Sequence, residues 1–347
     1  MKDSIFIQNI YYMLSYAYKV LREDGYRKLC FEEFENAVDL LSAILVKAVS
    51  VQIKRGLHRE YLEKTEKIGC VHGKIDINES IKTMSLMKKQ LVCTFDDFSI
   101  NSYMNRIIKT TMLILLKSDI KKSVRKDIKN LLLYFKGVDT LEIGDINWKM
   151  RYDRNNKSYE MIINICYLII KGLVQNEKDG NMKIMHFLDE QRMCRLYEKF
   201  LFEYFRKEYP EIRVSSPYIN WDIIGEADSM LPIMHADIVL EYEGKKLIID
   251  AKYYKNSVQR WFDKPTIHSS NLYQIYAYVK NMASRYDGEV SGLLLYAMTN
   301  EKVVPDNEYV MGGNRIGAKS LDLGVRFEEI EIQLNDIVRN NFNQMCK

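Results

Sequence analysis

The chain has 347 residues, of which 47% are hydrophobic and 28% are charged. This composition is ordinary for a globular protein of about two domains, and it excludes a disordered chain and a small disulfide scaffold. Lys and Arg together number 51 and Asp and Glu 47, a net charge of +4, so a surface that binds nucleic acid has to be local. The apolar run "MLILL" at 112–116 is too short to cross a bilayer, and we expect no membrane association.

The amino-terminal stretch "MKDSIFIQNIYYMLSYAYKV" has the spacing of an amphipathic helix and lacks the charged-then-apolar order of a signal peptide. Six cysteines are scattered without a CxxC pair, which argues against a zinc site: Cys30, Cys70, Cys93, Cys166, Cys194 and Cys346. We therefore expect reduced thiols in a cytoplasmic protein.

The first half of the chain is predicted to be mostly helical with a β-rich insertion. Apolar side chains recur at helical spacing in five stretches, 7–21, 32–54, 102–117, 120–137 and 158–175. Strand-like alternation at 61–80 and 90–101 flanks a basic connector. The connector carries Lys82, Lys88 and Lys89. We interpret the insertion, near 66–98, as a projecting element, and an ordinary solvated hairpin is the alternative.

The polar stretch "QNEKDGNMK" (175–183), with the turn signal Asp179-Gly180, is typical of a linker. It predicts an amino-terminal domain over 1–178 and a second domain over 179–347.

The second domain is predicted to be α/β, because helices and strands alternate along it. A helix over 189–209 ends at Pro210, and strands follow in 212–221 and 234–255. The later elements are expected to be a helix over 270–282, a strand over 291–298, a strand pair in "VRFEEIEI" (325–332) and a short final helix.

The stretch "ADIVLEYEGKKLIIDAKYY" predicts a β-hairpin that turns at Glu243-Gly244. A two-residue loop there places Asp237 directly opposite Asp250. A four-residue loop still leaves both on one face of the sheet, and only an odd-length loop separates them.

Two carboxylates on one face repel each other unless a cation lies between them, and oxygen ligands of this kind suit Mg²⁺. Lys252 shares that face and could assist an attacking water or stabilise a phosphate. The alternative is an exposed Asp–Lys pair, but the apolar run 247–249 indicates a buried strand. Gln274 and Tyr278 lie on one face of the next helix.

These residues resemble the core of the PD-(D/E)xK nucleases, with Ala236 in place of the proline of that motif. The resemblance implies that Asp237, Asp250 and the carbonyl of Ala251 hold the metal, that Lys252 assists the nucleophile, and that Gln274 and Tyr278 orient the site or the DNA. Glu198 fits the place where this family often has a glutamate on the preceding helix, although a solvent-facing helix charge remains the alternative.

The segment that follows the Asp-Ala-Lys strand is basic. Lys255, Arg260 and Lys264 are placed to contact DNA phosphates. His268, at the start of the next helix, either contacts a phosphate or serves the fold.

Five stretches in order resemble the McrC family, the nuclease subunits of McrBC-type 5-methylcytosine restriction systems: "IQNIYYMLSYAY", "VHGKIDI", "CTFDDFSINSYMNRIIKT", "DRNNKSYEMIINICYLIIKGL" and "LIIDAKYYK". The resemblance implies an McrB-like hexameric AAA+ GTPase as partner, which binds the GTP, and double-stranded DNA with modified cytosine as substrate. It also implies Mg²⁺, for which Mn²⁺ can substitute, and double-strand cleavage when two complexes meet. The chain has no GxxxxGK[ST] loop of its own.

Two alternatives stay open at this point. The chain could be a ring-docking activator with a vestigial nuclease core, or a nuclease that works without a motor. Four residues of the McrC-like stretch are interpreted as fold-stabilising rather than catalytic: Asp96, Asp97, Asn105 and Arg106.

Overall fold

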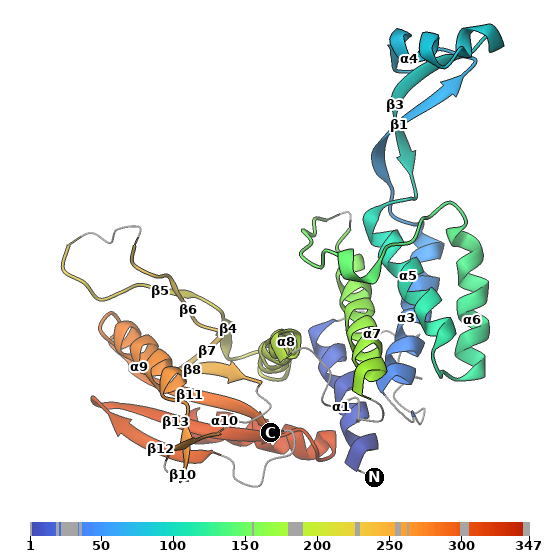
Figure 1. Cartoon of the computed structure of the whole chain (residues 1–347). Helices are drawn as coiled ribbons and strands as arrows, with labels where there is room; N and C mark the ends of the chain where they lie inside the picture. Colours follow the sequence, from blue (N-terminus) through green and yellow to red (C-terminus); the bar gives the residue numbers. More distant parts are fainter. Residues whose placement is uncertain are drawn as a thin grey trace. The chain divides into compact units, whose positions relative to one another are not determined.

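A computed structural model of the chain (Figure 1) describes residues 2–18, 21, 34, 37–154, 156–179, 190–225, 230–253, 258–261, 264–298 and 305–342. The chain forms two compact units, one of Met1–Leu40 with Asp179–Lys347 and the other of Leu41–Lys178. We call them the sheet unit and the helical unit. The predicted mixed helix–strand class is confirmed.

The break between Lys178 and Asp179 lies inside the polar stretch 175–183, but the first 40 residues group with the sheet unit and not with 41–178. The reason is the packing of α1 (Lys2–Ala17) on α8 (Glu190–Glu208) and α10 (Phe327–Phe342). The ring of Tyr16 lies 5.7 Å from that of Phe200 and 5.9 Å from that of Phe327. Buried aromatic contacts of this kind are strong, and they attach the amino terminus to the second half of the sequence.

Four helices build the helical unit: α3 (Ala37–Arg55), α5 (Tyr103–Lys117), α6 (Lys122–Leu132) and α7 (Tyr159–Asp179). Their inward faces bury Leu45, Ile107, Ile128 and Ile163 completely. Short 3₁₀ turns, η4 (Leu133–Phe135) and η5 (Ile143–Asp145), follow α6. No helix in the described part of the chain combines the length and apolar character needed to span a membrane.

A β-ribbon projects from these helices (Figure 1). Strand β1 (Glu60–Ile68) pairs antiparallel with β3 (Leu91–Ser99), from Glu60 opposite Ser99 to Ile68 opposite Leu91. The short β2 (Lys74–Asp76) pairs along the other edge of β3. We call residues 60–99 the ribbon; its strands agree with the predicted β-rich insertion.

The end of the ribbon consists of α4 (Ile77–Lys82) and the 3₁₀ turn η3 (Ser85–Lys88). The sequence predicted strand-like structure as far as residue 80 and a basic connector after it, so the strand prediction is wrong for 77–80. Gly73 allows the chain to return along β3, because its φ is +69° and a Cβ there would lie 2.3 Å from the carbonyl oxygen of Thr94. We call residues 77–89 the tip.

The sheet unit contains a six-stranded mixed sheet with the order β12-β13-β11-β8-β7-β4. Its central strands β8, β11 and β13 run parallel, and the outer pairs are antiparallel. The strands are β4 (Arg213–Ser215), β7 (Ile238–Tyr242), β8 (Lys245–Lys252), β11 (Glu289–Met298), β12 (Asp306–Met311) and β13 (Asn314–Asp322). Two small ladders lie outside this sheet, β5 (Tyr218–Ile219) with β6 (Met234–His235) and β9 (Val258–Trp261) with β10 (Lys264–Ile267).

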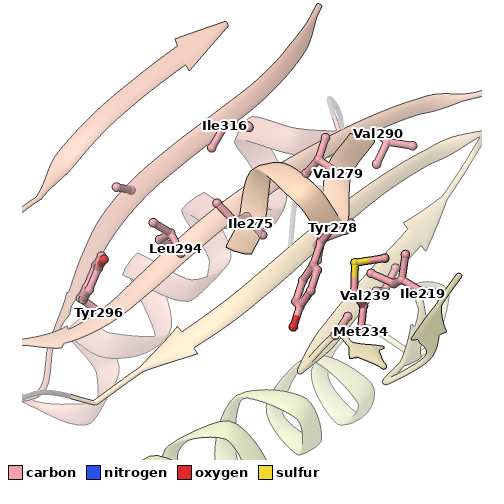
Figure 2. Close-up of a cluster of buried hydrophobic side chains, with 13 residues drawn as sticks. Ile219, Met234, Val239, Ile275, Tyr278, Val279, Val290, Leu294, Tyr296 and Ile316 are labelled. Atoms are coloured by element: carbon pink, nitrogen blue, oxygen red, sulfur yellow. The ribbon is translucent and has the colours of Figure 1, made fainter. Parts of the chain in front are cut away.

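Helix α9 (Ser269–Ala283) covers one face of the sheet. Figure 2 shows Ile275 and Val279 of this helix packed among buried side chains of the strands, including Leu294 and Ile316. Gly292 of β11 lies under the helix, and a Cβ there would come within 2.7 Å of Val279 Cγ2 and 2.8 Å of Ile275 Cγ1.

The predicted strand pair in 325–332 is wrong, because most of this stretch belongs to α10. Its buried side chains, Phe327, Ile330 and Leu334, follow helical spacing, whereas Ile332 is 56% exposed. The final strand pair is β12 with β13, which the sequence analysis missed. The signal was the Gly312-Gly313 turn, where both residues have positive φ.

Candidate active site

The β7–β8 hairpin has the register that the sequence predicted. Glu243 and Gly244 form a two-residue turn with φ of 46° and 75°, and the ladder runs from Tyr242 opposite Lys245 to Ile238 opposite Ile249. Asp237 directly precedes this ladder, and Asp250 is the next residue of β8. The Oδ2 of Asp237 accepts a hydrogen bond of 2.9 Å from the backbone N–H of Ala251.

A chain of polar contacts runs from Asp250 to α9. The Nζ of Lys252 lies 2.8 Å from Oδ2 of Asp250 and donates to Oε1 of Gln274 at 3.1 Å. The Nε2 of Gln274 in turn donates to the hydroxyl of Tyr278 at 2.9 Å. Figure 2 shows the ring of Tyr278 extending from α9 beside the buried cluster. The structure therefore brings together the two aspartates, the lysine and both helix residues.

Burial decides between a surface ion pair and an internal site. The Asp250 side chain is 1% exposed and the Lys252 side chain 13%. A pair this buried contrasts with exposed pairs, which contribute little and are common. Among the described residues, Oδ1 of Asp250 has no hydrogen-bond partner. The exposed-pair alternative is therefore wrong.

The environment disfavours negative charge on these carboxyl groups. Burial raises the pKa of Asp250 to about 7; Lys252 opposes this rise and Asp237 adds to it. Burial also raises the pKa of Asp237, against the backbone N–H of Ala251 and the charge of Lys252. The site is thus short of positive charge when both carboxylates are ionised.

Glu198 lies beside the site on α8. Its Oε1 is 3.1 Å from Sγ of Cys194, and the same Sγ is 3.8 Å from the carbonyl oxygen of Ala251. Burial, and secondarily the charge of Asp237, raises the pKa of Glu198. Glu198 is therefore not a purely solvent-facing charge. The sequence analysis missed Cys194, although its i, i+4 spacing from Glu198 could have indicated it.

The donor set fits a hard cation such as Mg²⁺. Two facing carboxylates and a backbone carbonyl supply oxygen ligands, and a buried carboxylate oxygen without a partner is the kind of atom that a cation would satisfy. In the part of the chain that the structure describes, no three His, Cys, Asp or Glu side chains are grouped tightly enough to hold a metal by themselves. Backbone, water and substrate oxygens would have to complete such a shell.

The other residues predicted for the site are His268, Arg260, Lys264 and Lys255. His268 is the N-cap of α9, where its carbonyl accepts hydrogen bonds from the N–H groups of Asn271 and Leu272. Arg260 and Lys264 lie in β9 and β10. Their side chains, and the whole of Lys255, lie outside the described residues.

The tip of the ribbon is a second unusual surface. Two serines are buried inside it: Ser80 is 0% exposed and donates to Asp76 O, and Ser85 donates to Ser80 O. The large side chains face outward, with Ile77, Ile81, Met84, Leu86 and Met87 all more than half exposed. Apolar groups gathered at an exposed end are typical of an interaction surface.

A family model described as "McrBC 5-methylcytosine restriction system component" matches residues 6–297. Over 337 residues the chain is 31% identical to the "Type IV methyl-directed restriction enzyme EcoKMcrBC" of Escherichia coli strain K12. The aligned region covers 95% of this chain and 96% of the relative. Both matches extend over the two units.

Two solved structures show a partial likeness. A half-complex of Thermococcus gammatolerans McrB AAA+ hexamers with bound McrC has 18% identity and a TM-score of 0.47, covering 95% of this chain and 76% of that one. The Thermococcus gammatolerans McrBC complex has 17% identity and a TM-score of 0.39, covering 58% of each chain.

Proposed function

The chain belongs to the family of McrBC 5-methylcytosine restriction system components, and from this membership we propose that it is the nuclease subunit of such a system. In this proposal the sheet unit hydrolyses DNA phosphodiester bonds with Mg²⁺, for which Mn²⁺ can substitute. The observation that carries the proposal is the cluster of the buried Asp250 with the partly buried Lys252 at the end of β8 and the partly buried Asp237 just before β7.

Each side chain has a distinct role in the proposed hydrolysis. Asp237, Asp250 and the carbonyl of Ala251 would hold the cation, with Glu198 reaching it through water. When bound, Mg²⁺ supplies positive charge beside the scissile phosphate and lowers the pKa of a coordinated water.

The chain itself contributes the positively charged ammonium group of Lys252, which its neighbours hold in place. Gln274 and Asp250 fix the ammonium of Lys252 between the strand and the helix, within reach of an attacking water or a phosphate oxygen. Tyr278 fixes Gln274 in turn. Lys252 therefore needs no rearrangement when substrate arrives.

We further propose that the ribbon docks on an McrB-like AAA+ GTPase hexamer and stimulates its hydrolysis of GTP. The outward aliphatic side chains of the tip support a protein partner, because moving a group of exposed apolar side chains out of water lowers the free energy. The GTP would be bound by the partner.

The proposed substrate is double-stranded DNA that contains modified cytosine. The family description names 5-methylcytosine, and the Escherichia coli relative is named methyl-directed. Double-strand cleavage would require two complexes to meet.

The test is the variant Asp250→Asn, assayed on methylated plasmid with the partner, GTP and Mg²⁺. We expect cutting to fall by roughly 10²–10³-fold, as when a preorganised charge is removed from an active site. The matched control is Glu241→Gln, on the neighbouring strand, where the carboxylate is 28% exposed and pairs with Lys246 and Arg213. Equal cutting by Asp250→Asn and wild type would exclude the assigned site.

The same assay separates the two alternatives. Substantial cutting by the wild-type chain without its partner would favour a nuclease that works alone. GTPase stimulation without any cutting by wild type would favour an activator with a vestigial core.

A further inference from the structure

Asn105 lies at the root of the ribbon, where β1 and β3 leave the helices. Its side chain is fully buried in the first turn of α5. Its Nδ2 donates to the carbonyl oxygens of His58 and Ile100, both at 2.8 Å. His58 lies two residues before β1, and Ile100 directly follows β3. One amide group thus holds both strands of the ribbon where they meet the helical unit.

Tyr159, the first residue of α7, completes this arrangement. Its hydroxyl donates to Oδ1 of Asn105 at 2.9 Å and accepts from the backbone N–H of His58 at 2.7 Å. Burial raises the pKa of Tyr159 to about 12, so the hydroxyl keeps the proton that it donates. His58 therefore gives both of its backbone groups to the same pair of side chains.

The network continues into the rest of the helical unit. Ser158, which precedes Tyr159, donates to Oε1 of Gln52 on α3 at 2.9 Å, and Gln52 donates to the carbonyl of Gly56 at the end of α3. Three helices that are distant in sequence thus converge on the ribbon root. Buried hydrogen bonds of this kind are costly to leave unpaired, so they hold one geometry.

Two further contacts attach the ribbon at its root: the N–H of Tyr103 donates to Oε2 of Glu60 at 3.4 Å, and Asn101 exchanges hydrogen bonds of 2.6 and 2.8 Å with Asp139. The Asn101–Asp139 pair is exposed, whereas Asn105 is fully buried. The ribbon projects from the helices (Figure 1), and its β1 side chains are largely exposed. Between the root and β2 it has only the two strands β1 and β3, and two strands alone are marginally stable in water. Small rotations at the root would move the tip by a large amount, because the ribbon is long. The root contacts therefore determine where the tip lies relative to the helices.

We propose that Asn105 and Tyr159 are positioning residues that fix the direction of the ribbon, so that a partner docked on the tip acts against a rigid element. The docking itself rests on the proposed function. The rigidity does not, and it can be measured on the chain alone.

The first test measures the distance between spin labels on the ribbon and on α6 by pulsed electron paramagnetic resonance. The labels are attached to the exposed Cys70 on the ribbon and to a cysteine introduced by Lys126→Cys on α6. Cys30, Cys194 and Cys346 are changed to Ser so that they take no label. Cys93 and Cys166 are kept because they are buried. We expect a narrow distance distribution that becomes at least twice as wide in Tyr159→Phe. The control Tyr134→Phe removes a hydroxyl from an exposed ring of the same unit and should leave the width unchanged.

An unchanged width in Tyr159→Phe would overturn the proposal, even where the melting temperature falls, because the hydroxyl would then serve stability alone. Asn105→Ala removes all three side-chain bonds and should widen the distribution further. A thermal melt of each variant shows which of them remain folded for the measurement.

The second test adds the AAA+ partner to the unlabelled variants. For Tyr159→Phe we expect the chain concentration that gives half-maximal stimulation to stay near the wild-type value. The maximal rate of GTP hydrolysis should fall roughly tenfold, as misplacement by an ångström can cost even more. A widened distribution with full stimulation would overturn the functional part. If the wild-type chain fails to stimulate the partner, docking is wrong, and the distance measurement still decides the role of the two residues.

Discussion

The candidate active site and the tip of the ribbon both depart from the usual distribution of polar and apolar side chains, but in different ways. The sheet unit buries Asp250 directly after the apolar run 247–249 and partly buries Lys252 and Asp237 beside it. The tip buries Ser80 and Ser85 and turns its aliphatic side chains outward. Charge is normally outside and apolar surface inside. Each departure indicates what would bind there: the site is short of positive charge, and the tip exposes apolar side chains that a partner could cover.

The comparison also predicts how each region responds to substitution. Removing the charge of Asp250 should cost function with little cost in stability, because burial disfavours that charge. Removing Lys252 leaves a buried carboxylate without its counter-ion and should cost stability as well as function. An outward apolar side chain contributes little to the fold, and replacing it should affect only what docks there. The three predictions below are ordered by the size of the expected effect.

Lys252→Ala should reduce DNA cutting by roughly 10²–10³-fold, because it removes the positioned ammonium from the site. The measurement is the single-turnover rate of cleavage with partner, GTP and Mg²⁺. Lys245→Ala is the control, since Lys245 lies at the other end of β8, where it pairs with Glu289. If Lys252→Ala cuts within threefold of the control, Lys252 serves the structure and does not take part in the hydrolysis.

Ile81→Asp combined with Met87→Asp should lower stimulation of the partner GTPase about tenfold or more, since charges would occupy the centre of an apolar interface. Both side chains are more than half exposed, so the melting temperature should hardly change. Titration of the chain against a fixed amount of partner measures the effect. Leu133→Asp, on a 63% exposed residue of η4, is the control. Equal loss in the control variant would show a general effect of added charge.

Thermal stability without divalent cations should fall as the pH rises from 5.5 to 8. The pKa of Asp250 is raised to about 7 in the folded chain, so the folded state keeps a proton that the unfolded state has lost, and this stabilisation disappears as pH rises through 7. Asp237 and Glu198 shift in the same direction. The melting temperature should drop by roughly 2–4 °C for each kcal/mol lost.

Added Mg²⁺ should restore much of this loss at pH 8 and little at pH 5.5, because it competes with protons for the same oxygens. Melting curves of wild type and Asp250→Asn, with EDTA or with Mg²⁺, separate the contributions. A wild-type curve as flat as that of Asp250→Asn would contradict the assignment of the titrating group.

The site could be predicted from sequence because its geometry depends on local turn chemistry. Glu243-Gly244 favours a two-residue turn, and that turn fixes the register that brings Asp237, just before β7, to Asp250. Helical spacing places Gln274 and Tyr278 on one face, and the resemblance to the PD-(D/E)xK nucleases assigned them to the site. Their roles in catalysis stay a prediction.

Other features depend on contacts between distant parts of the chain, and the sequence analysis did not find them. The bonds from Asn105 reach Tyr159, 54 residues away, and backbone carbonyls that no motif indicates. The position of α1 beside α8 depends on aromatic packing across most of the chain. In the tip, residues 77–80 were predicted as strand and the following residues as a basic connector. Only the structure shows that they form α4 and η3 and that their aliphatic side chains face outward.

Gly292 allows α9 to pack closely on the sheet, and this affects which substitutions would inactivate the protein. A single methyl group there would press on Ile275 and Val279, the neighbours of Gln274 and Tyr278 in the chain. The helix would lift, and the contact of 3.1 Å between Lys252 and Gln274 would open. A genetic screen for chains that no longer restrict foreign DNA should therefore yield substitutions of Gly292. This residue carries no charge and binds no ligand or proton, and it contributes only the space that a larger side chain would fill.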